Sequence, residues 1–180
     1  MANSKPASDA DAIALLKADH QQVKRLLRDF AAIKGESDQD ERKARLVDEL
    51  CDALTIHTRI EEELFYPAVR AAIDDNDLMD EAEVEHAGAR DLISQLAVMY
   101  PGDDHYDATV TVLGEEVEHH IEEEENEMFP KVRKAGIDLV TLGRQLAQRK
   151  EELDDDLAAP PAGTPAKGAR SARKPQRPPS

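Results

Sequence analysis

The chain has 180 residues, a length that suits one compact domain rather than two of full size. Asp and Glu outnumber Lys and Arg by 39 to 23, and the formal net charge of −16 disfavours nucleic acid or an anionic membrane as a partner of the main body. Aromatic residues make up 3% of the chain and Trp is absent, so the core must be built from aliphatic residues and Met, which suits packed helices.

Helical periodicity dominates from about residue 9 to residue 156. The first predicted helix has Ser8 as its N-cap and runs to Lys34, where Gly35 ends it. The second covers about residues 41–70 and contains Pro67, which is expected to kink or end it. The third opens at an acidic Asp-Asp-Asn-Asp stretch and reaches about Tyr100.

A Tyr-Pro-Gly-Asp-Asp segment is the clearest loop in the chain and precedes the fourth predicted helix, residues 105–134. A shorter fifth helix is expected to lie against the first four. We therefore expect an all-α fold, a four-helix bundle with a short extra C-terminal helix. The predicted divisions are a flexible N-terminus (1–8), the bundle (9–136), the additional helix (137–156) and a disordered tail (157–180).

The predicted tail is rich in Pro and Ala, contains five basic residues and has no acidic residue. Contact of this tail with RNA, or with the acidic body, stays open. The polar first residues lack the apolar stretch of a secretory signal, and no apolar run approaches the roughly 20 residues of a membrane-spanning helix. We expect a cytoplasmic protein without a membrane partner.

An internal repeat links the second and fourth predicted helices. The segments HTRIEEELFYP (57–67) and HIEEEENEMFP (120–130) align without a gap, so that His57 pairs with His120 and Glu61 with Glu124. Two helices that share a design in this way are expected to form a site with approximate two-fold symmetry.

Each of the four predicted bundle helices also directs a histidine into the core. The inner row of a bundle helix alternates steps of three and four residues, and all four rows contain one His. The second and fourth rows add a Glu one turn later. The inward polar residues are His20, His57, Glu61, His86, His120 and Glu124.

Such polar groups need partners, because burying a carboxylate alone is costly. Imidazole nitrogen and carboxylate oxygen suit iron, manganese or zinc, and six ligands from four helices fit two metal ions better than one tetrahedral zinc. A single buried His is commonly a hydrogen-bonded core residue, and the acidic run 122–125 on its own could be a solvated face. The six residues together favour a metal site.

This pattern resembles the hemerythrin-like (HHE cation-binding) domains over roughly residues 10–135, including the Phe-Pro or Tyr-Pro that follows each HxxxE. The resemblance implies an up-down-up-down bundle with a non-haem di-iron centre, two Fe ions with an oxo or hydroxo bridge. It also implies binding of dioxygen or a related small oxidant, in the sensing or handling of oxygen, redox state or iron. The four histidines would be terminal ligands, and the two glutamates would be bridges.

One position departs from the oxygen-carrying hemerythrins. They have a second histidine one turn after the first on the third helix, and this chain has Arg90 there. Glu85 or water could fill the resulting gap. The departure disfavours reversible oxygen carriage and favours sensing, redox chemistry or iron handling. His119 faces about 100° away from His120 and is expected to lie off the inner row.

Two other classes of function stay open. A ferritin-like di-metal oxidase or iron store would use Glu-x-x-His pairs, which Glu83 with His86 and Glu116 with His119 offer, although both glutamates fall off the inner row. A metal-dependent regulatory or interaction module would use the fifth helix and the tail. Cys51 is the only cysteine, which excludes an intrachain disulfide, and its apolar surroundings predict an inert thiol.

Overall fold

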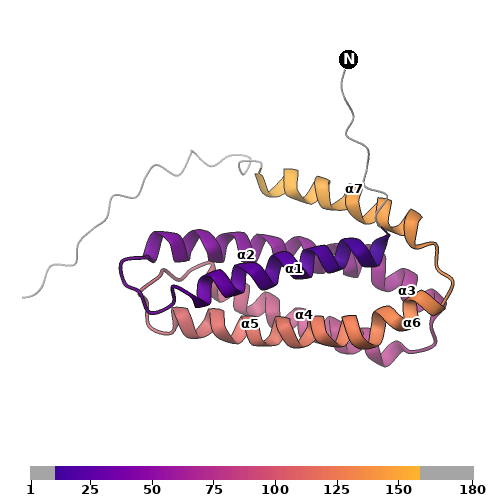
Figure 1. Cartoon of the computed structure of the whole chain (residues 1–180), viewed down its shortest axis with the longest axis horizontal. Coiled ribbons are helices and arrows are strands. Elements are labelled where there is room, and N and C mark those ends of the chain that lie inside the picture. The colour runs from indigo at the N-terminus through magenta and orange to yellow at the C-terminus, as the bar shows by residue number, and fades with distance from the viewer. Residues whose placement is uncertain (1–10, 159–180) are drawn as a thin grey trace, which may run out of the picture.

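Four long helical segments run antiparallel to their neighbours in chain order and form an up-down-up-down bundle (Figure 1). The computed structural model describes residues 11–158, and all regular elements within that range are helical. These elements are α1 (Ala12–Ala31), α2 (Asp40–Ile60), η1 (Glu61–Phe65), α3 (Tyr66–Ala72), α4 (Asn76–Leu96), α5 (Tyr106–Glu123), η2 (Glu124–Met128), α6 (Phe129–Lys134) and α7 (Leu139–Ala158). The predicted all-α class and bundle architecture are confirmed.

The helix ends differ from the prediction at several points. Ser8 lies outside the described residues, and α1 is instead capped by Asp11, whose carboxylate accepts a hydrogen bond of 2.8 Å from the Ala14 amide. The third helical segment ends at Leu96 and turns begin there, four residues before Tyr100. The final helix reaches Ala158, so the first two residues of the predicted tail are helical; the rest of the tail, and the predicted flexible segment 1–8, lie outside the described residues.

Neither proline of the repeat ends its helix. A wide π-helical turn, η1 or η2, precedes each proline, and the Tyr66 amide bonds to the Glu61 carbonyl five residues back, as the Phe129 amide does to that of Glu124. Pro67 and Pro130 then stand in the first turns of α3 and α6, where a missing amide hydrogen is tolerated. The helical path therefore continues through both prolines.

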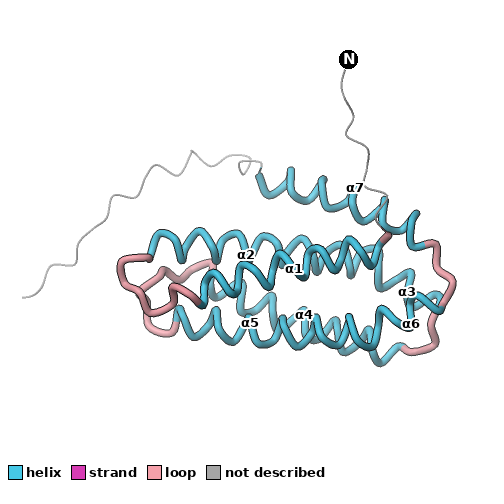
Figure 2. Tube along the Cα trace, viewed as in Figure 1, coloured by secondary structure: helices cyan, strands magenta, loops and turns pink. Residues whose placement is uncertain are grey.

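The α1–α2 and α4–α5 connections lie at the same end of the bundle (Figure 2). Gly35 adopts a positive φ of 86°, as glycine can without strain, and its amide donates a 2.9 Å hydrogen bond to Asp107 at the start of α5. Lys43 of α2 lies 3.4 Å from the same carboxylate. Asp107 thus ties the two loops together.

The apolar core falls into two clusters, one toward each end of the bundle. One includes Leu16, Phe65 and Met79 from three different segments, together with Leu146 of α7. The other includes Val23, Leu50 and Leu113. The level between the clusters is occupied by polar side chains.

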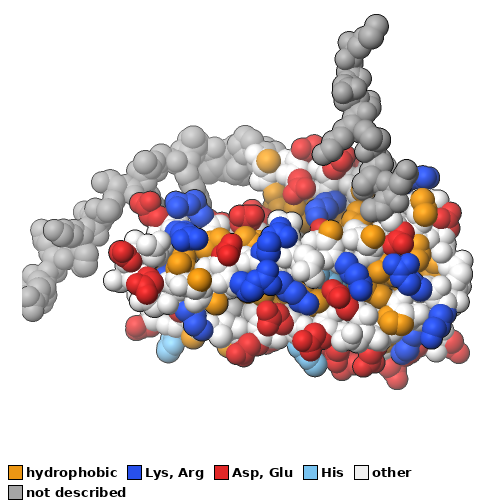
Figure 3. Space-filling view, viewed as in Figure 1, with side chains coloured by type: hydrophobic (Ala, Val, Ile, Leu, Met, Phe, Trp, Pro, Cys, Tyr) orange, Lys and Arg blue, Asp and Glu red, His pale blue; other side chains and the backbone are white. Residues whose placement is uncertain are grey.

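Helix α7 lies across α1 and α2 on the outside of the bundle (Figure 1). It has 20 residues, as many as α1, and buries Leu142, Leu146 and Leu153 against the bundle. None of the helices within residues 11–158 is both long enough and apolar enough to cross a membrane. The face drawn in Figure 3 carries both signs of charge, and Asp and Glu side chains gather along its lower edge.

Candidate metal centre

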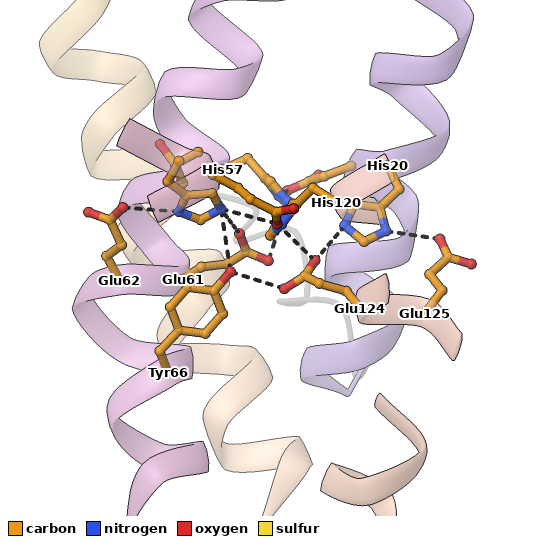
Figure 4. A network of polar contacts seen from close by, with 12 residues as sticks. His20, His57, Glu61, Glu62, Tyr66, His120, Glu124 and Glu125 are labelled. Carbon is orange, nitrogen blue, oxygen red and sulfur yellow. Dashed lines mark hydrogen bonds and ion pairs between the residues drawn. The ribbon is translucent and has the colours of Figure 1, made fainter. Parts of the chain in front are cut away.

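The structure brings all six predicted side chains together between the two apolar clusters. Each is almost completely buried, and the exposed fractions of Glu61 and Glu124 are 0% and 1%. His20 comes from α1, His57 from the end of α2, His86 from α4 and His120 from α5. Each of the four long segments thus contributes one histidine to the group (Figure 4). Clusters of this kind need strong partners, because isolated buried charges are costly.

The histidines form two pairs. The rings of His20 and His57 have centroids 5.0 Å apart, and those of His86 and His120 have centroids 4.7 Å apart. In the second pair the two Nε2 atoms approach to 3.1 Å. All four imidazoles direct Nε2 toward the centre.

The two glutamates lie between these pairs. Glu61 places Oε1 3.3 Å from His57 Nε2 and Oε2 3.4 Å from His86 Nε2, so each of its oxygens faces a different pair. Glu124 Oε2 lies 3.2 Å from His20 Nε2 and 3.6 Å from His120 Nε2. Both carboxylates therefore connect the two pairs.

An outer layer of four carboxylates faces the Nδ1 atoms of the histidines. The distances are 2.9 Å from His20 to Glu125, 3.5 Å from His57 to Asp19, 3.0 Å from His86 to Glu62 and 2.7 Å from His120 to Glu85. A carboxylate at Nδ1 fixes the proton there and leaves the Nε2 lone pair free for a ligand on the inside.

Sequence reasoning did not identify this outer layer, although it carried a signal. Glu62 and Glu125 are equivalent positions of the internal repeat, one residue after each inward glutamate. Asp19 and Glu85 each come directly before an inner-row histidine, His20 and His86 respectively. The approximate two-fold symmetry thus extends beyond the repeat and relates α1 to α4.

Tyr66 is a further site residue that the sequence reasoning missed. Its hydroxyl donates to Glu124 Oε1 at 3.1 Å and lies 3.3 Å from His86 Nε2. In an uninterrupted α-helix, residue 66 would lie about 140° around the axis from residue 61. The extra residue in the π turn turns it back toward the centre.

The symmetry breaks at this position, because the repeat partner of Tyr66 is Phe129. Phe129 stacks on His20 with nearly parallel rings, as Tyr66 stacks on His86. One half of the site therefore carries a hydroxyl, and the other half carries only an aromatic edge.

Arg90 does not point into the site. Its Nη1 lies 2.5 Å from Glu62 Oε1, the same oxygen that faces His86 Nδ1. Glu85, one candidate for the missing histidine ligand, lies behind His120 rather than inside the ring of ligands. The group that faces the inner space on this side is the Tyr66 hydroxyl.

Burial and the neighbouring charges together shift the pKa values of several residues in the site. Burial alone would lower the pKa of His120, but the charge of Glu124 and the hydrogen bond to Glu85 raise it to about 9. Burial alone would raise the pKa of the Glu124 carboxyl, but the neighbouring histidines have the larger effect and lower it. Burial raises the pKa of Tyr66 well above its usual value, and Glu124 and Glu61 add to the rise.

Several buried atoms of the site lack any hydrogen-bond partner among the described residues. At the centre they are His20 Nε2, His57 Nε2, both oxygens of Glu61 and Glu124 Oε2. In the outer layer they are His57 Nδ1 and Asp19 Oδ2, which lie 3.5 Å apart without forming a hydrogen bond. Buried polar atoms are otherwise almost always paired. Two ligand atoms that share a metal at about 2.1 Å lie roughly 3 to 3.5 Å apart, and the spacings across the centre match this.

The donor atoms divide into two groups that could each hold a metal ion. One consists of His20, His57, Glu61 and Glu124, and the other of Glu61, His86 and His120. A third group, Glu85, His119 and Glu123, lies at the surface. The residues present therefore fit two buried metal ions with at least one shared carboxylate.

A small cavity of about 20 Å³ adjoins the histidines on the side of the Val23 cluster. Its apolar walls include Leu54, Ala89, Val117 and Ile121. A water molecule needs roughly 10 to 15 Å³ measured in this way, so the cavity has room for one very small molecule.

Of the residues of the ferritin-like alternative, His86 lies in the centre, but its partner Glu83 and the second histidine, His119, do not. Glu83 lies at the surface and pairs with Arg70 at 2.9 Å. The side chain of His119 is 64% exposed and lies 3.3 Å from Glu123, off the inner row as expected from its helical position. His105 is an exposed residue at the start of α5.

Comparison with known proteins agrees with this geometry. Residues 11–132 match the hemerythrin HHE cation-binding domain model. Uncharacterized protein Rv2633c of Mycobacterium tuberculosis and uncharacterized protein Mb2666c of Mycobacterium bovis are both 32% identical over 148 residues, which span 77% of this chain and 84% of theirs.

A crystal structure is similar as well, that of a hemerythrin HHE cation-binding domain-containing protein from Mycobacterium kansasii, described as an Rv2633c homolog. It superposes with a TM-score of 0.71 at 31% identity and covers 83% of this chain and 90% of its own. The family implies metal binding, which the paired His and Glu clusters fit. The chain is a member of the hemerythrin HHE cation-binding domain family.

Proposed function

We propose that this protein holds a non-haem di-iron centre and uses it to bind dioxygen or a related small oxidant. The observation that carries the proposal is the pairing of four buried histidines around two carboxylates that face both pairs. Bound iron would supply reversible one-electron redox chemistry and open coordination positions. The residues that would hold it are His20, His57, Glu61, His86, His120 and Glu124.

The protein itself orients the histidine rings and shields the site from bulk water. Outer carboxylates hydrogen-bond to the Nδ1 atoms of His20, His86 and His120 and hold these rings with Nε2 inward, which supports ligation and raises the basicity of the ring. Asp19 lies at an ion-pair distance of 3.5 Å from the Nδ1 atom of His57. The Tyr66 hydroxyl faces the same space and would supply a further oxygen ligand in place of the histidine that Arg90 replaces. The two apolar clusters keep bulk water away from both ends of the site.

The apolar cavity supports a small, weakly polar ligand. It adjoins the four histidines, and five aliphatic side chains form part of its wall, so that it can hold a small, weakly polar ligand beside the histidines and is too small for a large substrate. Its size suits a diatomic molecule.

Metal content is the first test. Elemental analysis of protein expressed with iron and purified in air is expected to give about two irons per chain. His120→Ala should abolish the paired centre, whereas His119→Ala should retain native content because that ring lies at the surface. Equal loss in both variants would contradict the ligand assignment, and zinc or no metal in the native protein would contradict the iron centre.

Ligand access is tested separately. Ala89→Leu should fill the cavity, keep the metal and weaken binding of dioxygen or nitric oxide to the reduced protein. Ala97→Leu, at an exposed position after α4, is the matched control and should bind as the native protein does. Unchanged binding in Ala89→Leu would exclude this cavity as the ligand site.

A further inference from the structure

The additional helix reaches the metal centre through a chain of polar contacts. Lys150 of α7 forms an ion pair with Asp19 Oδ1, and the other oxygen of Asp19 lies 3.5 Å from His57 Nδ1. His57 in turn faces Glu61 with Nε2. A residue 131 positions away from Asp19 in the chain thus lies two contacts from a proposed metal ligand.

This contact breaks the two-fold symmetry of the outer layer. Asp19 and Glu85 occupy equivalent places before the histidines of α1 and α4, and each faces the Nδ1 of a histidine on another helix. Helix α7 packs on the α1–α2 side, and its lysine reaches Asp19. Glu85, by contrast, has the surface ring of His119 at 3.9 Å as its neighbour besides His120.

Lys150 provides positive charge in an otherwise acidic groove beside Asp19. It is the one basic residue among those lining a groove of about 420 Å³ that Asp19 also lines. Glu49, Asp52 and Asp154 line the same groove, and the Lys150 side chain is 29% exposed. Without the ammonium group, the Asp19 carboxylate would face acidic neighbours and water in the groove, and its hold on His57 would weaken.

We propose that Lys150 is a positioning residue for the metal centre and acts through Asp19 to hold His57 in its ligating orientation. The additional helix is thereby part of the metal site rather than only a cover for the bundle. This inference rests on the proposed role of His57 as a ligand. Losing a direct outer partner of a metal ligand typically weakens metal binding by roughly 10- to 100-fold. Lys150 lies one contact further out than Asp19, so its loss is expected to act at the lower end of that range.

Arg149 offers a matched control on the same helix. Its guanidinium binds Glu63 at 2.6 Å, and Glu63 contacts no histidine but retains Arg59 at 2.9 Å if Arg149 is lost. Arg149→Met and Lys150→Met each remove one cation from α7 and its ion pair with the bundle. Only Lys150→Met removes the partner of Asp19.

The first measurement is release of bound metal to EDTA from the purified full chain, followed by elemental analysis. Lys150→Met should release metal roughly tenfold faster or more, whereas Arg149→Met should release it at the native rate. Lys150→Arg keeps the positive charge and should release metal at a rate close to that of the native protein. Equal rates in Lys150→Met and Arg149→Met, whether fast or native, would overturn the proposal. A native protein without metal would instead contradict the proposed function.

The second measurement needs no metal. Nitrogen-15 NMR of the histidine rings in the metal-free full chain should show His57 with its proton on Nδ1, which faces Asp19 at 3.5 Å. This signal should be lost in Lys150→Met and kept in Arg149→Met. His120, whose Nδ1 faces Glu85, is the internal reference and should not change. An unchanged His57 signal in Lys150→Met would overturn the positioning role even if metal release were altered.

Discussion

At the scale of single residues, the two halves of the centre are alike except at a few positions, and those positions are informative. Tyr66 and Phe129 occupy equivalent places next to His86 and His20, yet only Tyr66 carries a polar atom. In the metal-free site, burial and the nearby glutamates hold the proton on this phenol by raising its pKa. A bound cation would reverse that effect and favour the phenolate.

Tyr66→Phe should therefore remove a phenolate-to-iron absorption band from the visible spectrum while both histidine pairs keep their metal. The substitution reproduces the side chain already present at the equivalent position, so the packing should tolerate it. Tyr100→Phe, at a residue that is 62% exposed, serves as the control. A visible spectrum identical to that of the native protein in Tyr66→Phe would exclude the phenol as a ligand.

Cys51 is a second residue whose surroundings determine its chemistry. Burial, followed by the charges of Asp48 and Asp52, raises the pKa of this half-buried thiol from 9.0 to about 12. The reactive thiolate is therefore scarce below pH 10. We expect slow reaction of the folded protein with a disulfide reagent at pH 8 and fast reaction in denaturant. Fast reaction in the folded state would contradict the prediction of an inert thiol.

At the scale of elements, the π turns and α7 decide what the centre contains. Each π turn adds one residue to a helix at the inward glutamate, which rotates the following aromatic residue toward the histidines. Helix α7 is amphipathic, and its buried leucines belong to the same apolar cluster as Ile13 and Phe65. It is therefore an integral part of the fold.

Leu146→Ala should lower the free energy of unfolding by about 2 to 5 kcal/mol, because it opens a cavity under α7 in a fully buried part of the core. Leu157→Ala, at the exposed end of the same helix, should change it by about 0.5 kcal/mol or less. Chemical denaturation of the metal-loaded proteins gives both values. Similar small effects from the two substitutions would show that α7 is not packed as described.

At the scale of the whole molecule, the bundle holds its polar groups in the middle and its apolar groups toward both ends. Four imidazoles and two carboxylates share one buried level, and several of their atoms are without hydrogen-bond partners among the described residues. A metal ion that bound there, and only to the folded state, would stabilise the folded chain.

Removing the metal with a chelator should lower the melting temperature by about 5 °C or more. A ligand at a hundred times its dissociation constant contributes about 2.7 kcal/mol, and 1 kcal/mol corresponds to about 2 to 4 °C for a chain of this size. Differential scanning calorimetry with and without metal measures the shift, and readdition should reverse it. A melting temperature independent of metal would contradict a structural contribution from the centre.

The sequence by itself determined the helical class, the bundle and the set of six inward residues, because all of these follow from local periodicity. A row of apolar residues that recurs every three or four positions must face the core, and so must a histidine that falls on that row, whatever the neighbouring helices are. Only the tertiary structure decided the rest. Asp19 contacts His57, Glu85 contacts His120 and Lys150 contacts Asp19, and in each pair the two residues lie on different helices. The periodicity within one helix cannot predict which residue of another helix lies opposite. Tyr66 reached the centre through a π turn, which departs from the 3.6-residue repeat on which the helical prediction depends.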